Sequence, residues 1–126
     1  MILVFGGAYQ GKLEYVLETY DINENDVYRC DRESVQIDYD KKVIYGLEKF
    51  VFACVKEGFD ARELILRDMD KLDNKILIFD DISQGIVPLD KDERAWREAS
   101  GRCMVALGKA ADEVIRVFCG LGTKIK

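Results

Sequence analysis

The segment MILVFGGAYQGKLEYV, residues 1–16, decides the fold, because it joins an apolar run to a glycine-rich loop and an amphipathic stretch. Phosphate-binding loops follow the pattern Gly, four residues, Gly, Lys and then Ser or Thr. Gly6, Gly11 and Lys12 match this pattern, but Leu13 takes the position of the hydroxyl that normally binds Mg²⁺. The segment predicts a strand, a phosphate-binding loop and a helix. The alternative is a tight turn with Lys12 exposed to solvent.

The remaining chain alternates between apolar runs and amphipathic stretches. Such alternation predicts a single three-layer α/β domain over residues 1–126, in which a mostly parallel five-stranded sheet has its first strand at the centre. Ligands bind such sheets at the carboxyl ends of the strands. The expected strands are 1–5, 27–30, 41–46, 75–81 and 113–120, and the expected helices are 11–20, 47–58, one capped by Asp60, and 93–110, opened by Asp90 or Asp92.

Composition excludes several classes of function. The net charge of −5 gives no electrostatic footprint for nucleic acid. No apolar run approaches the roughly 20 residues of a membrane span, and the start lacks a signal peptide, so we expect a cytoplasmic protein. The four cysteines are scattered, which predicts buried free thiols rather than a zinc site or a disulfide framework. The chain has no histidine, so imidazole is unavailable as base, nucleophile or metal ligand.

Two adjacent acids end the strand expected at 75–81. Asp80 and Asp81 are candidate metal ligands, because hard cations such as Mg²⁺ prefer carboxylate oxygens. Lys12 and Asp81 are the candidate catalytic residues. The alternative for both acids is a cap and a solvated charge. The expected cofactor-binding residues are those of the loop: Gly6, Gly7, Ala8, Gln10, Gly11, Lys12 and Leu13.

Three arginines of the long helix lie near one face. Arg94, Arg97 and Arg102 have the residue type that grips phosphate or an acidic substrate edge. Pairing with neighbouring acids, such as Glu93, Glu98 or Asp112, is the alternative for each of them.

The segment GIVPLDKDERAWREASGRCMVALGKAADEVIRVFCGLGTKIK, residues 85–126, resembles the bifunctional adenosylcobinamide kinase / adenosylcobinamide-phosphate guanylyltransferase family of cobalamin synthesis. The opening ILVFGGAYQGK is similar to the start of the same family. Together the two regions cover about half of the chain. The matching features of the second region are Gly85–Pro88, Arg94, Trp96, Arg97, Glu98, Gly101, Arg102, Ala111–Val114 and Gly120.

This resemblance implies a P-loop NTPase-like domain that binds ATP or GTP and assembles as a homo-oligomer. Family members phosphorylate the aminopropanol hydroxyl of adenosylcobinamide. They then transfer GMP to that phosphate through a guanylyl-histidine intermediate. The resemblance therefore implies a nucleotide and adenosylcobinamide, or a related small molecule, as ligands.

The departures from the family fall on its catalytic residues. This chain has no histidine, which excludes guanylyl transfer by that route. Leu13 and Tyr45 stand where relatives carry magnesium-binding oxygens, and Met104 stands where an asparagine is expected. The sequence therefore predicts a nucleotide-binding protein with impaired catalysis, with ATP or GTP as the expected cofactor and Mg²⁺ as a possible further one. The alternatives are an active small-molecule kinase that holds magnesium with Asp80 and Asp81, and a structural or partner-binding paralogue that binds no nucleotide.

Overall fold

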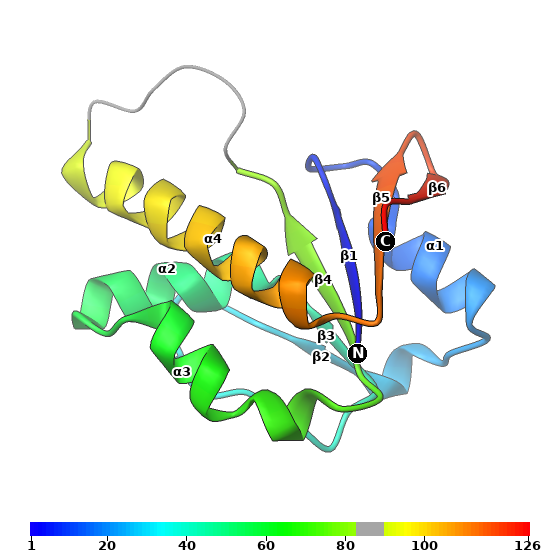
Figure 1. The fold of residues 1–126 in the computed structure, drawn as a ribbon, viewed down its shortest axis with the longest axis horizontal. Coiled ribbons are helices and arrows are strands. Elements are labelled where there is room, and N and C mark those ends of the chain that lie inside the picture. The colour runs from blue at the N-terminus through cyan, green and yellow to red at the C-terminus, as the bar shows by residue number, and fades with distance from the viewer. Residues whose placement is uncertain (83–89) are drawn as a thin grey trace.

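The apolar runs of the chain assemble into one sheet in the computed structural model, which describes residues 1–82 and 90–126 (Figure 1). Within these residues six strands lie in the order β2-β3-β4-β1-β5-β6. All neighbouring pairs are parallel except β5 and β6. The strands are β1 (Ile2–Gly6), β2 (Val27–Arg29), β3 (Val43–Tyr45), β4 (Ile76–Asp80), β5 (Glu113–Phe118) and β6 (Leu121–Lys124). The expected central position of the first strand is confirmed.

Helices cover both faces of the sheet, as expected for three layers. Figure 1 shows α1 (Lys12–Thr19) on one side and α2 (Leu47–Glu57), α3 (Ala61–Arg67) and α4 (Lys91–Ala110) on the other. Short 3₁₀ turns at Glu24–Asp26 and Met69–Leu72 precede β2 and β4. No helix in the described part of the chain is long and apolar enough to cross a membrane.

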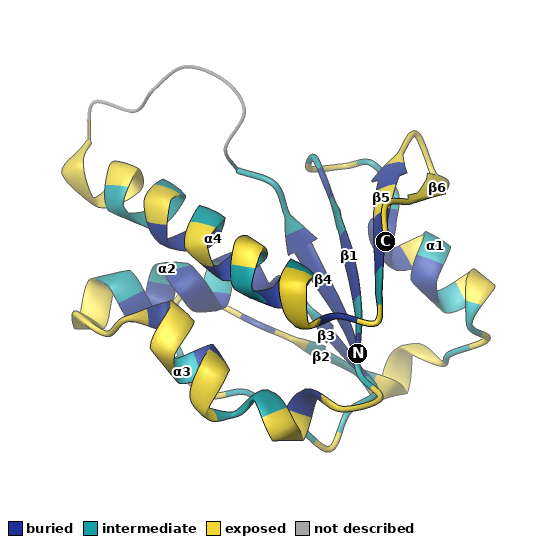
Figure 2. Cartoon of the chain, in the orientation of Figure 1, coloured by how far each residue is buried: buried dark blue, intermediate teal, exposed yellow. Residues whose placement is uncertain are grey.

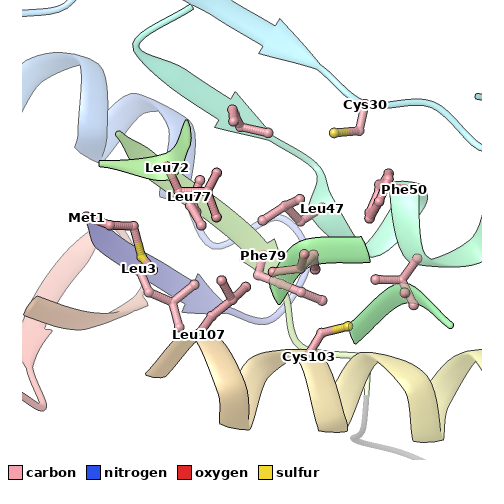
Figure 3. Close-up of a cluster of buried hydrophobic side chains, with 14 of the residues drawn as sticks. Met1, Leu3, Cys30, Leu47, Phe50, Leu72, Leu77, Phe79, Cys103 and Leu107 are labelled. Carbon is pink, nitrogen blue, oxygen red and sulfur yellow. The ribbon is translucent and has the colours of Figure 1, made fainter. Parts of the chain in front are cut away.

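The side chains of β1 and β4 alternate between two apolar cores. Leu3 and Phe79 are buried with α2, α3 and α4, together with Leu107 and Cys103 of α4 (Figure 3). Val4, Ile76 and Ile78 are buried on the opposite face with Leu13 and Val16 of α1. Figure 2 shows that the buried residues line the inner sides of the helices. Strands that are buried on both faces read as continuous apolar runs, which explains why MILV and ILIF marked them so clearly.

Two acidic caps begin helices where the sequence suggested them. The Asp60 side chain accepts a hydrogen bond from the Glu63 backbone N–H at 3.2 Å, and α3 follows. Of the two candidates for the long helix, Asp90 is the cap: it accepts from the backbone N–H groups of Asp92 and Glu93. The motif at Gly85–Pro88 lies outside the described residues.

The expectation of five strands is wrong, because β6 adds an antiparallel sixth. Cys119 and Gly120 have φ values of 52° and 76°, the geometry of a tight two-residue hairpin turn that returns the chain alongside β5. All four residues of β6 are exposed, so the strand has no apolar pattern to reveal it. The expectation that all four thiols are buried is also wrong for one of them. Cys119 is exposed in this turn, while Cys30, Cys54 and Cys103 are buried. All four thiols are free.

Candidate functional site

The glycine-rich loop joins the carboxyl end of β1 to the start of α1. Gly11 has a φ of 81° and precedes α1 without a side-chain cap, so the first amides of the helix receive no capping oxygen from that residue. Uncapped N–H groups at a helix start, together with the helix dipole, favour an anion at this position. The local backbone therefore suits phosphate.

Close packing against the last two strands holds the loop in shape. A Cβ atom on Gly6 would lie 2.4 Å from the carbonyl oxygen of Val117, so only glycine fits there. The Gln10 carbonyl accepts a hydrogen bond from the Gly120 N–H at 2.8 Å, and the Gln10 side-chain oxygen accepts one from the Cys119 N–H at 2.8 Å. Gln10 thus ties the loop to the β5–β6 turn through its backbone carbonyl and through its side chain.

Lys12 is buried beneath the loop rather than exposed to solvent. Its side chain is 4% exposed, and its ammonium donates a hydrogen bond to the Gly7 carbonyl at 2.7 Å. The same ammonium forms a 2.5 Å salt bridge with the carboxylate of Asp80, which is 26% exposed. Gly6 and Asp80 are register partners on neighbouring strands, which explains why the acid lies directly beside the loop.

Asp80 and Asp81 lie on opposite faces of the sheet. Successive side chains of a strand alternate, so Asp80 shares the α1 side with Ile78 and meets Lys12. Asp81 instead lines a small cavity against α4, of about 140 Å³, with Arg97 and Ser100. The structure therefore brings together Lys12 and Asp80 of the expected site, and it gives Asp81 a different cavity.

Glu48 supports this end of β4 from the first turn of α2, and the sequence had not singled it out. Its carboxylate accepts a hydrogen bond from the Asp80 backbone N–H at 3.0 Å, and its carbonyl accepts one from the Trp96 indole at 2.7 Å. Burial raises the pKa of Glu48 above its ordinary value, although the Asp80 N–H opposes the shift. Glu48 thereby ties α2, β4 and α4 together behind the loop.

A cavity of about 420 Å³ opens beside the loop at the carboxyl ends of β2, β3 and β4. Residues from six stretches of the chain line it: Ala8, Tyr9, Gln10, Gly11, Lys12, Leu13, Glu14, Glu24, Arg29, Tyr45, Lys49 and Asp80. It contains five of the seven expected cofactor-binding residues, and Gly6 and Gly7 lie directly before them in the chain. Arg29 and Lys49 were not expected. Each stands at or just after the end of a short strand, which is the signal that could have found them.

Tyr45 occupies the wall of this cavity. The Arg29 guanidinium lies 5.3 Å from the centre of its ring, because the two residues are register partners on β2 and β3. Burial raises the pKa of the Tyr45 hydroxyl, and the carboxylates of Asp80 and Glu48 raise it further. The phenol therefore keeps its proton at neutral pH.

The three candidate arginines of α4 lie in different surroundings. Arg97 and Arg102 line a shallow surface pocket with Arg62, Glu98 and the backbone of Gly101, away from the loop cavity. Arg94 is exposed one turn into the helix. No group of three or more histidine, cysteine, aspartate or glutamate side chains that could hold a metal ion occurs in residues 1–82 and 90–126.

The comparison with curated proteins gives one distant match. The chain is 31% identical over 81 residues to the bifunctional adenosylcobalamin biosynthesis protein CobU of Salmonella typhimurium strain LT2. The match covers 63% of this chain and 45% of that protein, so the chain spans about half the length of the relative. No protein-family model matches. The resemblance predicted from the motifs is thus confirmed as a distant similarity.

Proposed function

We propose that the chain binds ATP or GTP, with its phosphates against the glycine-rich loop, and that its phosphoryl transfer is impaired. The observation that carries this proposal is the buried Lys12 ammonium beside the uncapped start of α1, both facing a cavity of about 420 Å³. A phosphate there would accept the third N–H of a desolvated ammonium whose other partners are the Gly7 carbonyl and the Asp80 carboxylate. Charge-assisted hydrogen bonds of this kind are about twice as strong as neutral ones.

The topology supports the same proposal at the coarser level of fold. A loop between the central strand and a following helix, at the carboxyl edge of a parallel sheet, is the arrangement of P-loop NTPase-like domains. The distant similarity to a cobalamin biosynthesis protein agrees with a nucleotide ligand and makes adenosylcobinamide the first small molecule to test. Assembly as a homo-oligomer remains a prediction, which sedimentation velocity tests.

The residues around the loop do not fit a protein-held magnesium ion. Among the described residues that line the cavity, Leu13 offers no oxygen, the Asp80 carboxylate is paired with Lys12, and the carboxylates of Glu14 and Glu24 do not join it in a group of three that could hold a metal ion. Tyr45 offers only a protonated phenol. Developing charge on a transferred phosphoryl group would lack its usual metal stabiliser, which is why we propose binding with little or no turnover.

Titration calorimetry with ATP, GTP and GDP tests this proposal. We expect each nucleotide to bind the natural chain, and Lys12→Ala to lose binding because it removes the loop cation. Lys42→Ala is the matched control, since that lysine bonds to the Asn74 carbonyl and is absent from the lining of the loop cavity. Absence of binding by the natural chain would favour the structural paralogue. Magnesium-dependent phosphorylation of adenosylcobinamide would favour the active kinase.

A further inference from the structure

The cavity beside the loop is lined by three cations and three carboxylates, and two of the cations are not part of the loop motif. Lys12 is neutralised by Asp80, but Arg29 and Lys49 form no salt bridge among the described residues. Both line the same cavity as the loop. Glu14 and Glu24 also line it, and they are exposed like Arg29, so solvent screens the charges of all three. The positive charges of Arg29 and Lys49 are therefore available to a ligand.

Arg29 is exposed, and a contact with an aromatic ring positions its side chain. Its register partner on β3 is Tyr45, and the guanidinium lies over that ring at 5.3 Å. Stacking on an aromatic face restrains the side chain and leaves the edge of the guanidinium free to donate two parallel hydrogen bonds to phosphate oxygens. Where the family resemblance implies an oxygen that binds magnesium, this chain thus has the aromatic ring of Tyr45, which contacts the Arg29 guanidinium.

Lys49 reaches the cavity from another element. It belongs to the first turn of α2, directly after Glu48, and is half-buried where α2 leaves the end of β3. The three cations of the cavity therefore come from α1, β2 and α2, and they line the same cavity beside the loop. This is the side on which the outer phosphates of a nucleotide held at Lys12 would lie.

We infer that Arg29 and Lys49 form a subsite for the outer phosphates of the bound nucleotide and take the role of the magnesium ion that Leu13 and Tyr45 no longer support. This inference rests on the proposed nucleotide binding. It follows that the chain binds a nucleoside triphosphate without a divalent metal, and that it prefers a triphosphate to a monophosphate because two side chains grip the outer groups.

Titration calorimetry with ATP and AMP, in EDTA and in magnesium, tests the inference. We expect ATP to bind equally well, within about threefold, in both buffers. Arg29→Ala should weaken ATP binding in EDTA by about 10- to 100-fold, as expected for loss of a charged hydrogen-bonding partner, and leave AMP binding nearly unchanged. Arg29→Lys keeps the charge without the paired donors and should fall between. Lys49→Ala should weaken ATP binding in the same direction.

Arg116→Ala is the matched control, because Arg116 also stacks on an aromatic ring, 5.9 Å from Phe118, but lies outside the cavity. ATP binding that requires magnesium, or an Arg29→Ala effect no larger than that of Arg116→Ala, would overturn the inference while nucleotide binding itself stands. Absence of nucleotide binding in either buffer would overturn the proposed function and the inference together. Circular dichroism checks that each variant is folded.

Discussion

Leu13 is the residue at which packing and metal chemistry compete. It is 8% exposed and belongs to the apolar core beneath α1, so it stabilises the helix that a hydroxyl at this position would loosen. Leu13→Ser and Leu13→Ala remove similar volume, but only the serine adds a possible metal ligand. We expect both to lower the free energy of unfolding by about 2–5 kcal/mol. Only Leu13→Ser should make ATP binding stronger in magnesium than in EDTA, measured by calorimetry. An equal response of both variants to magnesium would contradict this.

Glu48 is the residue whose buried charge gives the site a pH dependence. Its ordinary pKa of 4.5 is raised in the folded chain, chiefly by burial, so the folded state holds the proton more tightly than the unfolded state. Its contribution is most favourable below pH 4.5 and is lost as the pH rises through the raised value. Glu48→Gln can still accept from the Asp80 N–H but carries no charge.

The variant should therefore gain stability relative to the natural chain as the pH rises from 4.5 to 8. Urea unfolding of both proteins across that range measures the difference, in which the titration of other carboxylates cancels. A difference that does not change with pH would show that burial does not shift this carboxyl group.

At the scale of elements, replacing a glycine by alanine should change the free energy of unfolding in opposite directions in β1 and in α4. Gly6 ends β1 where any side chain would meet the Val117 carbonyl, whereas Gly108 lies in α4 with open space around its missing Cβ. We expect Gly6→Ala to lower the free energy of unfolding by at least about 1–3 kcal/mol, the range for overpacking. Gly108→Ala should raise it by up to about 1 kcal/mol, since alanine favours helix. Urea denaturation measures both changes, and a neutral Gly6→Ala would contradict the close approach.

Elements were predictable from sequence where one local signal dominated. The buried strands at Ile2–Gly6 and Ile76–Asp80 are continuous apolar runs, and Asp60 begins a helix by a local side-chain bond. The strand Leu121–Lys124 was missed because it is held by pairing with β5 rather than by burial. Tertiary hydrogen bonds of this kind leave no periodic pattern in the sequence.

The site was predictable in part for the same reason. The loop from Gly6 to Lys12 is a local motif, and the structure keeps it contiguous. The faces of Asp80 and Asp81 followed from strand alternation and could have been foreseen. Their positions at or after strand ends mark Arg29 and Lys49 as residues of the ligand edge, but assigning them to the loop cavity requires the sheet order in which β2 and β3 lie on the same side of β1 as β4.

At the scale of the whole molecule, the two edges of the sheet differ in their relation to the cavity. β2 and β6 are the edge strands, each paired on one side only, so both should open locally at lower free energy than the central β1 and β4. Opening of β2 would remove Arg29 from the cavity, whereas no residue of β6 lines it. A ligand suppresses the openings that destroy its site, by an amount that grows with its concentration over its dissociation constant.

We therefore predict that ATP in EDTA slows hydrogen exchange more in β2 than in β6, whose turn contacts the loop but which lines no part of the cavity. Without nucleotide, both edges should exchange faster than Ile2–Gly6 and Ile76–Asp80, whose side chains fill both cores. Hydrogen exchange followed by mass spectrometry of peptides from each strand measures this, and β6 serves as the internal control. In Arg29→Ala the slowing at β2 should disappear, because β2 then carries no contact to the phosphates. Equal slowing of both edges, or of neither, would contradict a subsite built on β2.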